Sequence, residues 1–347
     1  THTFCGDGEL TIENLSWNSG QYADQAQYFK KKWKVFTGLL EIRRVLLNLD
    51  DVNQLKDRVF PLLWQLPCAL LMTGRVCGAD WPVAVHRLSP LDRRYWRDFY
   101  RCCGQLPLTP GEIQRLDMFC AEVQGNPLLM RLALCSPDQP PALGAGKDDL
   151  TRYFIRRPLM SQTDIRVLRC LALLPAGGME TGRFLRASGL KAAALERLCA
   201  MSLVWVRQQD GQSLCGLHPV IAESVRRCYP PAPENCRRFL RGMQEEYAHI
   251  WDEPYGKVVK AVPVCFSLLD AWPTPRAWLA DSYDTFATVL WIGGYFGESL
   301  QYMLRLYQSC EEHYGAVHQV TGSIAMRVGA VYHNSMQFSS AKAWYQK

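Results

Sequence analysis

The chain has 347 residues, a length that corresponds to two or three domains of about 100–200 residues each. Hydrophobic residues make up 48% of it, which excludes an intrinsically disordered chain, and a net charge of +6 does not by itself indicate nucleic-acid binding. The 14 cysteines contain no C-x-x-C pair, so their spacing argues against a zinc site and favours free thiols in a reducing cytoplasm. No apolar run reaches the roughly 18 residues needed to cross a membrane.

The apolar pattern predicts helices and short strands in the first part of the chain. Residues 24–42 have the three-to-four spacing of a helix. Two short apolar runs, 45–49 and 69–72, end abruptly at polar residues and predict strands of a parallel sheet covered on both faces. Residues 93–135 have helical spacing again.

Two breaks divide the rest of the chain. A Pro/Gly-rich linker at 136–147 is followed by a compact stretch of mixed pattern at 150–229. Prolines cluster again at 230–233, and the residues after them have helical spacing throughout.

Acidic residues follow the first predicted strand, at the edge where parallel sheets bind ligands. Asp50 ends the strand and Asp51 follows it, and a carboxylate there can hold the Mg²⁺ that bridges nucleotide phosphates. Arg75 follows the next strand, where its guanidinium could reach a γ-phosphate. Taken singly, Asp50 is more simply interpreted as a helix cap or a turn residue, and Arg75 as a surface arginine.

A Gly-Asn-Pro segment opens an apolar helix further along. Gly125 and Pro127 break the preceding helix, so the backbone there could lie against a flat ligand such as adenine. The alternative is that these residues only start a helix.

Four motifs come in a fixed order with compact spacing: VLLNLDDV, LLMTGR, RLSPLD and VQGNPLLMRLAL. As an ordered set they resemble the Walker B, sensor 1, following-loop and GxP motifs of the NB-ARC/STAND family of signalling ATPases. Further on, LRCLALLPAGGM, FLRASGL, LERLCAMSLVWV and LHPVIAESVRRCY resemble the winged-helix domain of the same family. The resemblance covers roughly residues 40–230.

The resemblance implies roles for individual residues. Asp50 would bind Mg²⁺ and Asp51 would polarise the attacking water, so these two are the catalytic candidates. Arg75 would sense the γ-phosphate, and Pro127 would lie near the adenine. His218, in a Leu-His-Pro form of the family's Met-His-Asp motif, would contact the β-phosphate of ADP and hold the winged helix against the nucleotide domain. Without the family, His218 is more simply interpreted as a helix-start or core histidine.

The chain departs from the family pattern at three points. Asn48 interrupts a strand that is usually fully apolar, and Pro219 stands where an acidic partner for His218 is expected. No G-x-x-x-x-G-K-[ST] motif occurs, and the nearest match, at 144–148, lies in the linker and lacks the first glycine and the hydroxyl residue. We therefore expect the phosphate-binding loop upstream of Thr1, ATPase activity only in the full-length protein, and weak nucleotide binding by this chain alone.

The helical tail contains an internal repeat. Residues 294–302 resemble residues 336–344 at an offset of 42, so that Phe296 matches Phe338. A small residue at one shared place lets two helices approach closely, while aromatic residues fill the neighbouring gap. This resembles TPR repeats in their 42-residue form, with an ordinary helical bundle as the alternative. Because such an array needs about three or more units, we expect further repeats after Lys347.

Together these features predict a multidomain chain that combines α/β and α parts: the C-terminal part of a P-loop NTPase sheet with a helical lid, a winged-helix domain and a TPR α-solenoid. The expected parts are 1–92 for the nucleotide domain, 93–136 for the lid, 137–149 for a linker, 150–230 for the winged helix and 234–347 for the repeats.

The expected function is a cytoplasmic signal-transduction switch regulated by ADP and ATP, of a bacterial defence or regulatory type. Its cofactors would be ATP or ADP with Mg²⁺, and its partners a protein or peptide on the TPR face and further copies of itself. A turnover ATPase and a TPR-containing transcriptional regulator are the alternatives. In the regulator, the helix at 192–202 would read DNA, but Arg197 is its only basic residue, so nucleic acid is the less favoured partner.

Overall fold

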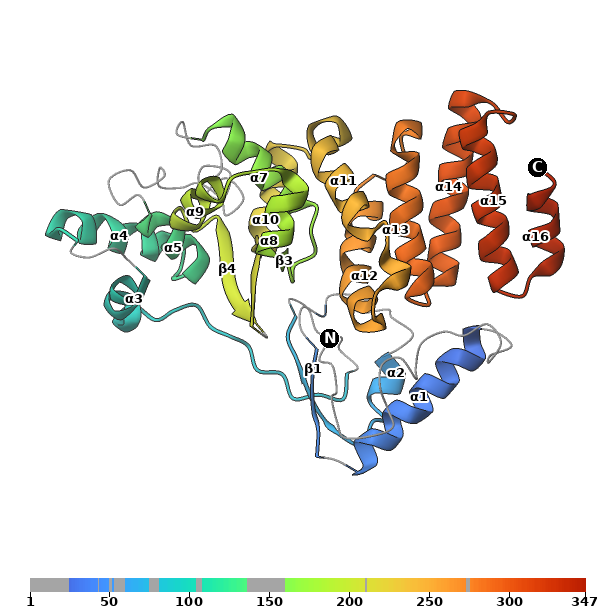
Figure 1. The fold of residues 1–347 in the computed structure, drawn as a ribbon. Helices are drawn as coiled ribbons and strands as arrows, with labels where there is room; N and C mark the ends of the chain where they lie inside the picture. Colours follow the sequence, from blue (N-terminus) through green and yellow to red (C-terminus); the bar gives the residue numbers. More distant parts are fainter. Residues whose placement is uncertain are drawn as a thin grey trace. The chain divides into compact units, whose positions relative to one another are not determined.

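The computed structural model describes residues 25–42, 44–49, 52, 60–74, 81–103, 108–135, 160–209, 211–272 and 275–347. These residues form mostly helices with small sheets, in agreement with the expected combination of α/β and α parts (Figure 1). The chain divides into two compact units, Thr1–Leu88 and Ser89–Lys347.

The first unit contains a pair of parallel strands. Its elements are α1 (Gln25–Ile42), β1 (Leu46–Leu49), α2 (Phe60–Leu63) and β2 (Ala69–Met72). The predicted parallel pairing is confirmed, with Leu46 opposite Ala69 and Leu49 opposite Met72. The expected burial on both faces differs from what is found in the described residues, because residues along each strand alternate between exposed and half-buried, and Leu46 is 61% exposed.

The second unit begins with a small helical subdomain, which comprises η2 (Arg93–Tyr95), α3 (Trp96–Cys103), α4 (Pro110–Glu122) and α5 (Pro127–Leu134). Helix α4 starts at a capping box in which Thr109 and Glu112 each accept a hydrogen bond from the other's backbone. Phe119 and Met130 are fully buried between these helices. We call this part the lid subdomain.

A mixed subdomain follows, in which three helices precede a hairpin. Its elements are α7 (Gln162–Ala172), β3 (Met179–Glu180), α8 (Thr181–Ser188), α9 (Ala192–Ala200), β4 (Val204–Gln209), β5 (Gln212–Leu217) and α10 (Pro219–Cys228). The three strands form an antiparallel sheet in the order β3-β5-β4. Gly211 provides the left-handed residue, at φ +74°, that the tight turn between β4 and β5 requires.

An ion pair between a buried carboxylate and a half-exposed guanidinium joins α7 to α9 in this subdomain. Asp164 is 1% exposed, caps α7 through Ser161, and accepts hydrogen bonds from the Arg197 guanidinium at 2.5 and 3.1 Å. Burial by itself raises the pKa of the Asp164 carboxyl, but the hydrogen bonds from Arg197 and Ser161 outweigh it and hold that pKa below its usual range. The basic residue of α9 is therefore engaged within the subdomain.

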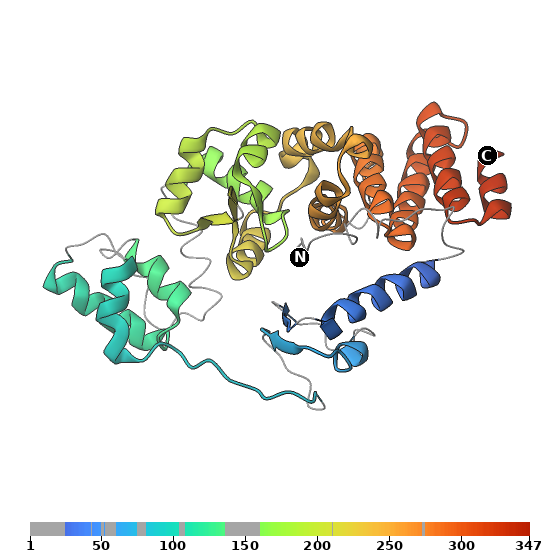
Figure 2. The same cartoon turned by 60° about the horizontal axis from the view of Figure 1, so that its bottom comes forward.

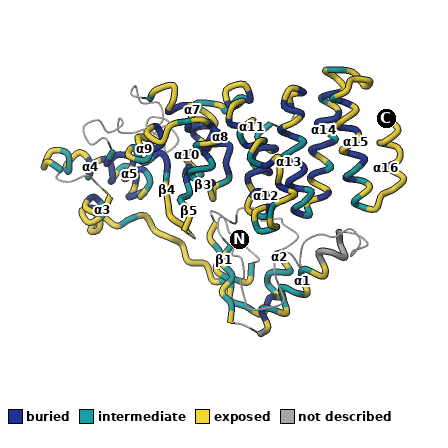
Figure 3. Tube along the Cα trace, in the orientation of Figure 1, coloured by how far each residue is buried: buried dark blue, intermediate teal, exposed yellow. Residues whose placement is uncertain are grey.

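Helices alone make up the remainder of the second unit. They are α11 (Pro233–Tyr247), η3 (Ile250–Asp252), α12 (Tyr255–Asp270), η4 (Ala277–Leu279), α13 (Ala280–Ile292), α14 (Phe296–Tyr314), α15 (Gln319–Asn334) and α16 (Phe338–Tyr345). From α12 onward each helix packs against the next, and Figures 1 and 2 show them standing side by side in a row. Figure 3 shows buried residues along α12 to α15, whereas α16 is mostly exposed. We call this row the helical array.

The 42-residue offset found in the sequence also relates two turns of the helical array. Between α13 and α14, the backbone N–H of Tyr295 donates to the Leu290 carbonyl at 2.9 Å. Between α15 and α16, Gln337 donates to Tyr332 at the same 2.9 Å, and both pairs are related by the offset of 42. The two helix–turn–helix units therefore share a backbone conformation as well as a sequence pattern.

Each of these turns contains one left-handed residue and one small buried residue. Gly294 has φ +87°, and Met336 occupies the equivalent place at φ +59°. Ser299 is fully buried and its counterpart Ala341 is 2% exposed, so the small side chain lies where two helices touch. A methionine in the left-handed region is uncommon, because its Cβ crowds the following carbonyl oxygen.

Replacing Met336 with glycine is expected to raise the free energy of unfolding by roughly 0.5–1 kcal/mol, because glycine adopts the left-handed conformation without strain. Met336 is 37% exposed, so the packing lost is small. Gln337→Gly is the matched control: this residue has φ −93°, and glycine there should destabilise the protein. Urea unfolding of both variants measures the difference, and a Met336→Gly variant less stable than the wild type would contradict the interpretation.

Asp164→Asn is expected to lower the free energy of unfolding at neutral pH. The Asp164 carboxyl has a lower pKa in the folded protein than in the unfolded chain, so its contribution is present above the ordinary carboxyl pKa and is lost as the pH falls through the folded value. The difference in free energy of unfolding between wild type and variant should therefore stay constant down to about pH 5 and shrink only below about pH 4. Urea unfolding at a series of pH values measures it.

The exposed pair of Glu223 and Arg227 provides the control, and Glu223→Gln should change stability by less than about 0.5 kcal/mol. If the effect of Asp164→Asn on stability disappeared already between about pH 7 and pH 5, burial rather than the ion pair would determine the pKa of the Asp164 carboxyl.

Candidate functional site

The acidic residues predicted at the first strand end lie outside the described residues, as does Arg75. The structure describes the backbone around Asp50 and Asp51: Thr73 donates to the Leu49 carbonyl at 2.9 Å, and Val52 donates to the Thr73 carbonyl at 2.7 Å. The carboxyl end of β1 is thus bonded to the end of β2 on both sides of the acidic pair. The metal and catalytic roles of Asp50 and Asp51 remain predictions.

Pro127 occupies the first turn of α5. Asn126 caps this helix by accepting a hydrogen bond from the Leu129 backbone N–H at 3.2 Å, and Pro127 lies at the first helical position, where its missing N–H costs nothing. Pro127 is exposed. The helix-start interpretation therefore holds, and the proline ring is also accessible to a ligand.

Gly125 joins this helix start to the loop that begins the second unit. Leu91 donates to the Gly125 carbonyl at 3.0 Å, and the Leu91 carbonyl in turn accepts from the indole of Trp96 at 2.9 Å. Gly125 has φ +67°, and a Cβ there would lie 2.3 Å from the Leu91 oxygen. The RLSPLD and VQGNPLLMRLAL motifs, separate in the sequence, thus meet at a position that accommodates only glycine.

His218 connects the end of β5 to α10. It is the N-cap of α10, with its Nδ1 accepting from the Val220 backbone N–H at 3.3 Å, and its side chain is exposed. An Nδ1 that accepts a hydrogen bond places the proton of the neutral ring on Nε2, which is then a donor. His318 caps α15 in the same way, through Val320 at 3.2 Å, so a histidine N-cap occurs twice in this chain.

A contact at Ser202 links the lid subdomain to the one that carries His218. The Ser202 hydroxyl lies 3.2 Å from the Arg131 Nε and 3.2 Å from the Cys135 Sγ, both at the end of α5. Ser202 stands in the turn between α9 and β4, at the left-handed φ of +54°, and β4 pairs with β5, which leads into His218. A continuous series of bonded elements therefore connects the helix started by Pro127 to the strand that ends at His218.

This link could not be predicted from local sequence patterns, because Arg131 and Ser202 are 71 residues apart. A serine in the left-handed region has no recognisable sequence pattern, unlike the glycines at the other turns.

Within the described ranges, no three His, Cys, Asp or Glu side chains come together in a group that could hold a metal ion. No disulfide joins the cysteines of those ranges. None of the helices there has the length and apolar character to cross a membrane.

No protein-family model matches the chain, and no curated protein matches it.

Gly125→Ala is expected to destabilise the second unit by at least about 2 kcal/mol, because it combines a left-handed residue with a clash against backbone. Gly111→Ala is the matched control within α4, where a Cβ would meet only the end of the Arg115 side chain at 3.9 Å. That change should be neutral or stabilise the helix by roughly 0.5–1 kcal/mol. Denaturant unfolding followed by circular dichroism distinguishes them, and equal effects of the two substitutions would exclude the proposed role of Gly125.

Proposed function

We propose that this chain is part of a nucleotide-regulated signalling switch of the STAND class, with a TPR-type helical array as its protein-binding part. The observation that carries the proposal is the position of His218. It follows the last strand of a subdomain whose elements run helix, strand, helix, helix, hairpin, and it opens the next helix with an exposed imidazole. A histidine at this junction is what the resemblance to the winged-helix domain of the family implies.

The element order of the α7–α10 subdomain and its antiparallel sheet support its interpretation as a winged helix, in which β4 and β5 would be the wing. In this interpretation α9 corresponds to the helix that reads DNA in other winged helices. Arg197 on α9 is bonded to buried Asp164, which disfavours a role in binding phosphates of DNA. The subdomain would therefore serve as a structural part of the switch, and the transcriptional-regulator alternative is the weaker one.

The proposed nucleotide would contact residues of the second unit. Two described residues fit it: Pro127 has an exposed ring beside the tight Gly125 backbone, suited to the face of adenine, and His218 has an Nε2–H donor suited to a phosphate oxygen. Asp50 would hold Mg²⁺, Asp51 would orient water, and Arg75 would contact the γ-phosphate. A phosphate-binding loop would complete the site.

The switch would use the difference between ADP and ATP contacts. A nucleotide shifts a two-state equilibrium only through its different affinity for the two states. One hydrogen bond between His218 and a phosphate contributes about 1.5–3 kcal/mol, which corresponds to roughly a tenfold to hundredfold change in the ratio of the states. ADP would thus favour a closed form, and ATP an open form that assembles with other copies.

The helical array would bind the protein or peptide that triggers the switch. Its repeated turns and its small buried residues, Ser299 and Ala341, are features of TPR repeats, which bind peptides and proteins. An ordinary helical bundle would not be expected to repeat the same turn at a fixed 42-residue offset.

The test uses the protein that carries the expected phosphate-binding loop. His218→Asn is expected to weaken ADP retention roughly tenfold and to raise the fraction of assembled protein in the absence of a triggering partner. The reason is that asparagine is a good N-cap but cannot place a donor where Nε2 lies. ADP release is measured with a fluorescent ADP analogue, and the oligomeric state by light scattering.

His318→Asn is the matched control, since it changes the equivalent cap of α15 and should leave ADP retention unchanged. If His218→Asn retained ADP like the wild type and stayed in the same oligomeric state, His218 would be only a helix cap. Steady hydrolysis at tens of turnovers per second would instead support the turnover ATPase.

A further inference from the structure

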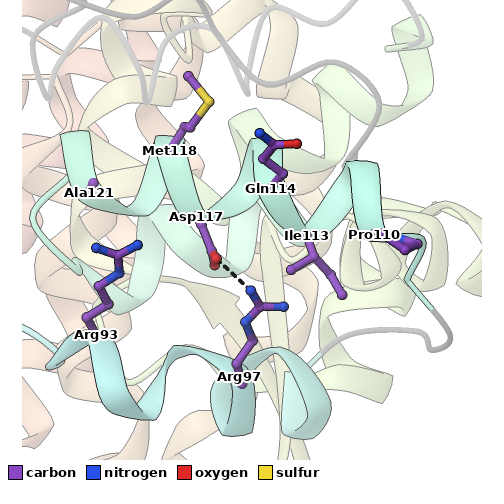
Figure 4. Close-up of a pocket in the computed structure, with 8 residues that line it drawn as sticks. All are labelled: Arg93, Arg97, Pro110, Ile113, Gln114, Asp117, Met118 and Ala121. Carbon is purple, nitrogen blue, oxygen red and sulfur yellow. Dashed lines mark hydrogen bonds and ion pairs between the residues drawn. The ribbon is translucent and has the colours of Figure 1, made fainter.

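A hollow of about 490 Å³ lies on the lid subdomain between α3 and α4. It is lined by arginines from η2 and α3 and by polar and apolar side chains of α4. Figure 4 shows Arg93 and Arg97 extending from below toward α4, with Asp117 reaching from α4 toward Arg97. We call this feature the Arg93 hollow.

Three arginines of η2 and α3 have carboxylate partners. Arg94 lies 3.5 Å from Asp92, Arg97 lies 2.7 Å from Asp117, and Arg101 lies 3.3 Å from Asp98.

Arg93 is different from these arginines. In the part of the chain that the structure describes, its guanidinium has a ring contact with Trp96 at 5.9 Å but no carboxylate partner. The hollow therefore contains one positive charge that the lid subdomain does not neutralise.

The neighbouring groups make the hollow more selective than an exposed arginine. Asp117 accepts hydrogen bonds from both Arg97 and the Tyr100 hydroxyl, at 2.7 and 3.1 Å, which fixes the Arg97 side chain in place. Ile113 and Ala121 line the hollow with apolar surface, and Met118, 53% exposed, adds more. An anion carried on an apolar body would match this lining in both charge and polarity.

We propose that the Arg93 hollow binds an acidic segment of a partner protein, with one carboxylate on Arg93 and an adjoining apolar side chain against Ile113. This acidic segment provides Arg93 with the carboxylate partner that the arginines at 94, 97 and 101 already have within the chain. This interaction surface is separate from the nucleotide switch and does not depend on it.

A fluorescein-labelled peptide of alternating Glu and Leu tests the proposal with the 347-residue chain, by fluorescence polarisation. Peptides of alternating Gln and Leu, and of alternating Lys and Leu, serve as controls. The wild type should bind the Glu-Leu peptide, and Arg93→Gln should weaken that binding roughly tenfold through loss of a charge-assisted hydrogen bond.

Arg101→Gln is the matched variant: it removes the same charge from the same helical segment, outside the hollow, and should change binding less than about twofold. Both arginines are exposed, and equal thermal unfolding of the two variants verifies that they fold. Three results would overturn the proposal: equal weakening by the two variants, equal binding of the Gln-Leu peptide, or no binding of the Glu-Leu peptide.

Discussion

The carbonyl oxygen of Leu91 occupies the place where any side chain at position 125 would begin, and this close approach determines how the second unit is built. It holds the entry loop against the start of α5, and α5 in turn reaches Ser202 through Arg131 and Cys135. Through β4 and β5 the same series of contacts leads to His218. The start of α5 and the start of α10, where the adenine and phosphate contacts are proposed, are therefore linked through the side-chain hydrogen bonds of Ser202.

Left-handed residues recur at the turns of this unit. Glycines fill most of these places, at 125, 178, 189, 211 and 294, but Gln124, Ser202 and Met336 fill three of them at a cost in strain. At Ser202, the hydrogen bonds of the hydroxyl with Arg131 and Cys135 of the lid subdomain compensate for this strain.

Much of the fold follows from local sequence patterns, namely the spacing of apolar residues and the positions of glycine and proline. The apolar spacing predicted the helix at 24–42, which forms as Gln25–Ile42, and the strand at 69–72 forms as Ala69–Met72. Glycine and proline marked the start of α5, and the 42-residue offset anticipated two identical turns. What could not be predicted depends on residues far apart in the chain, such as Asp164 with Arg197 or Arg97 with Asp117. The exposure of β1 and β2 was also missed, because an apolar run does not reveal what covers it.

The central claim is that one nucleotide contacts the start of α5 and the start of α10 together. Hydrogen–deuterium exchange, with and without ADP, on the protein that carries the phosphate-binding loop tests it most directly. We expect ADP to slow exchange both at 125–129 and at the Val220 amide, which His218 caps. Protection at only one of these two places, or at neither, would contradict the account.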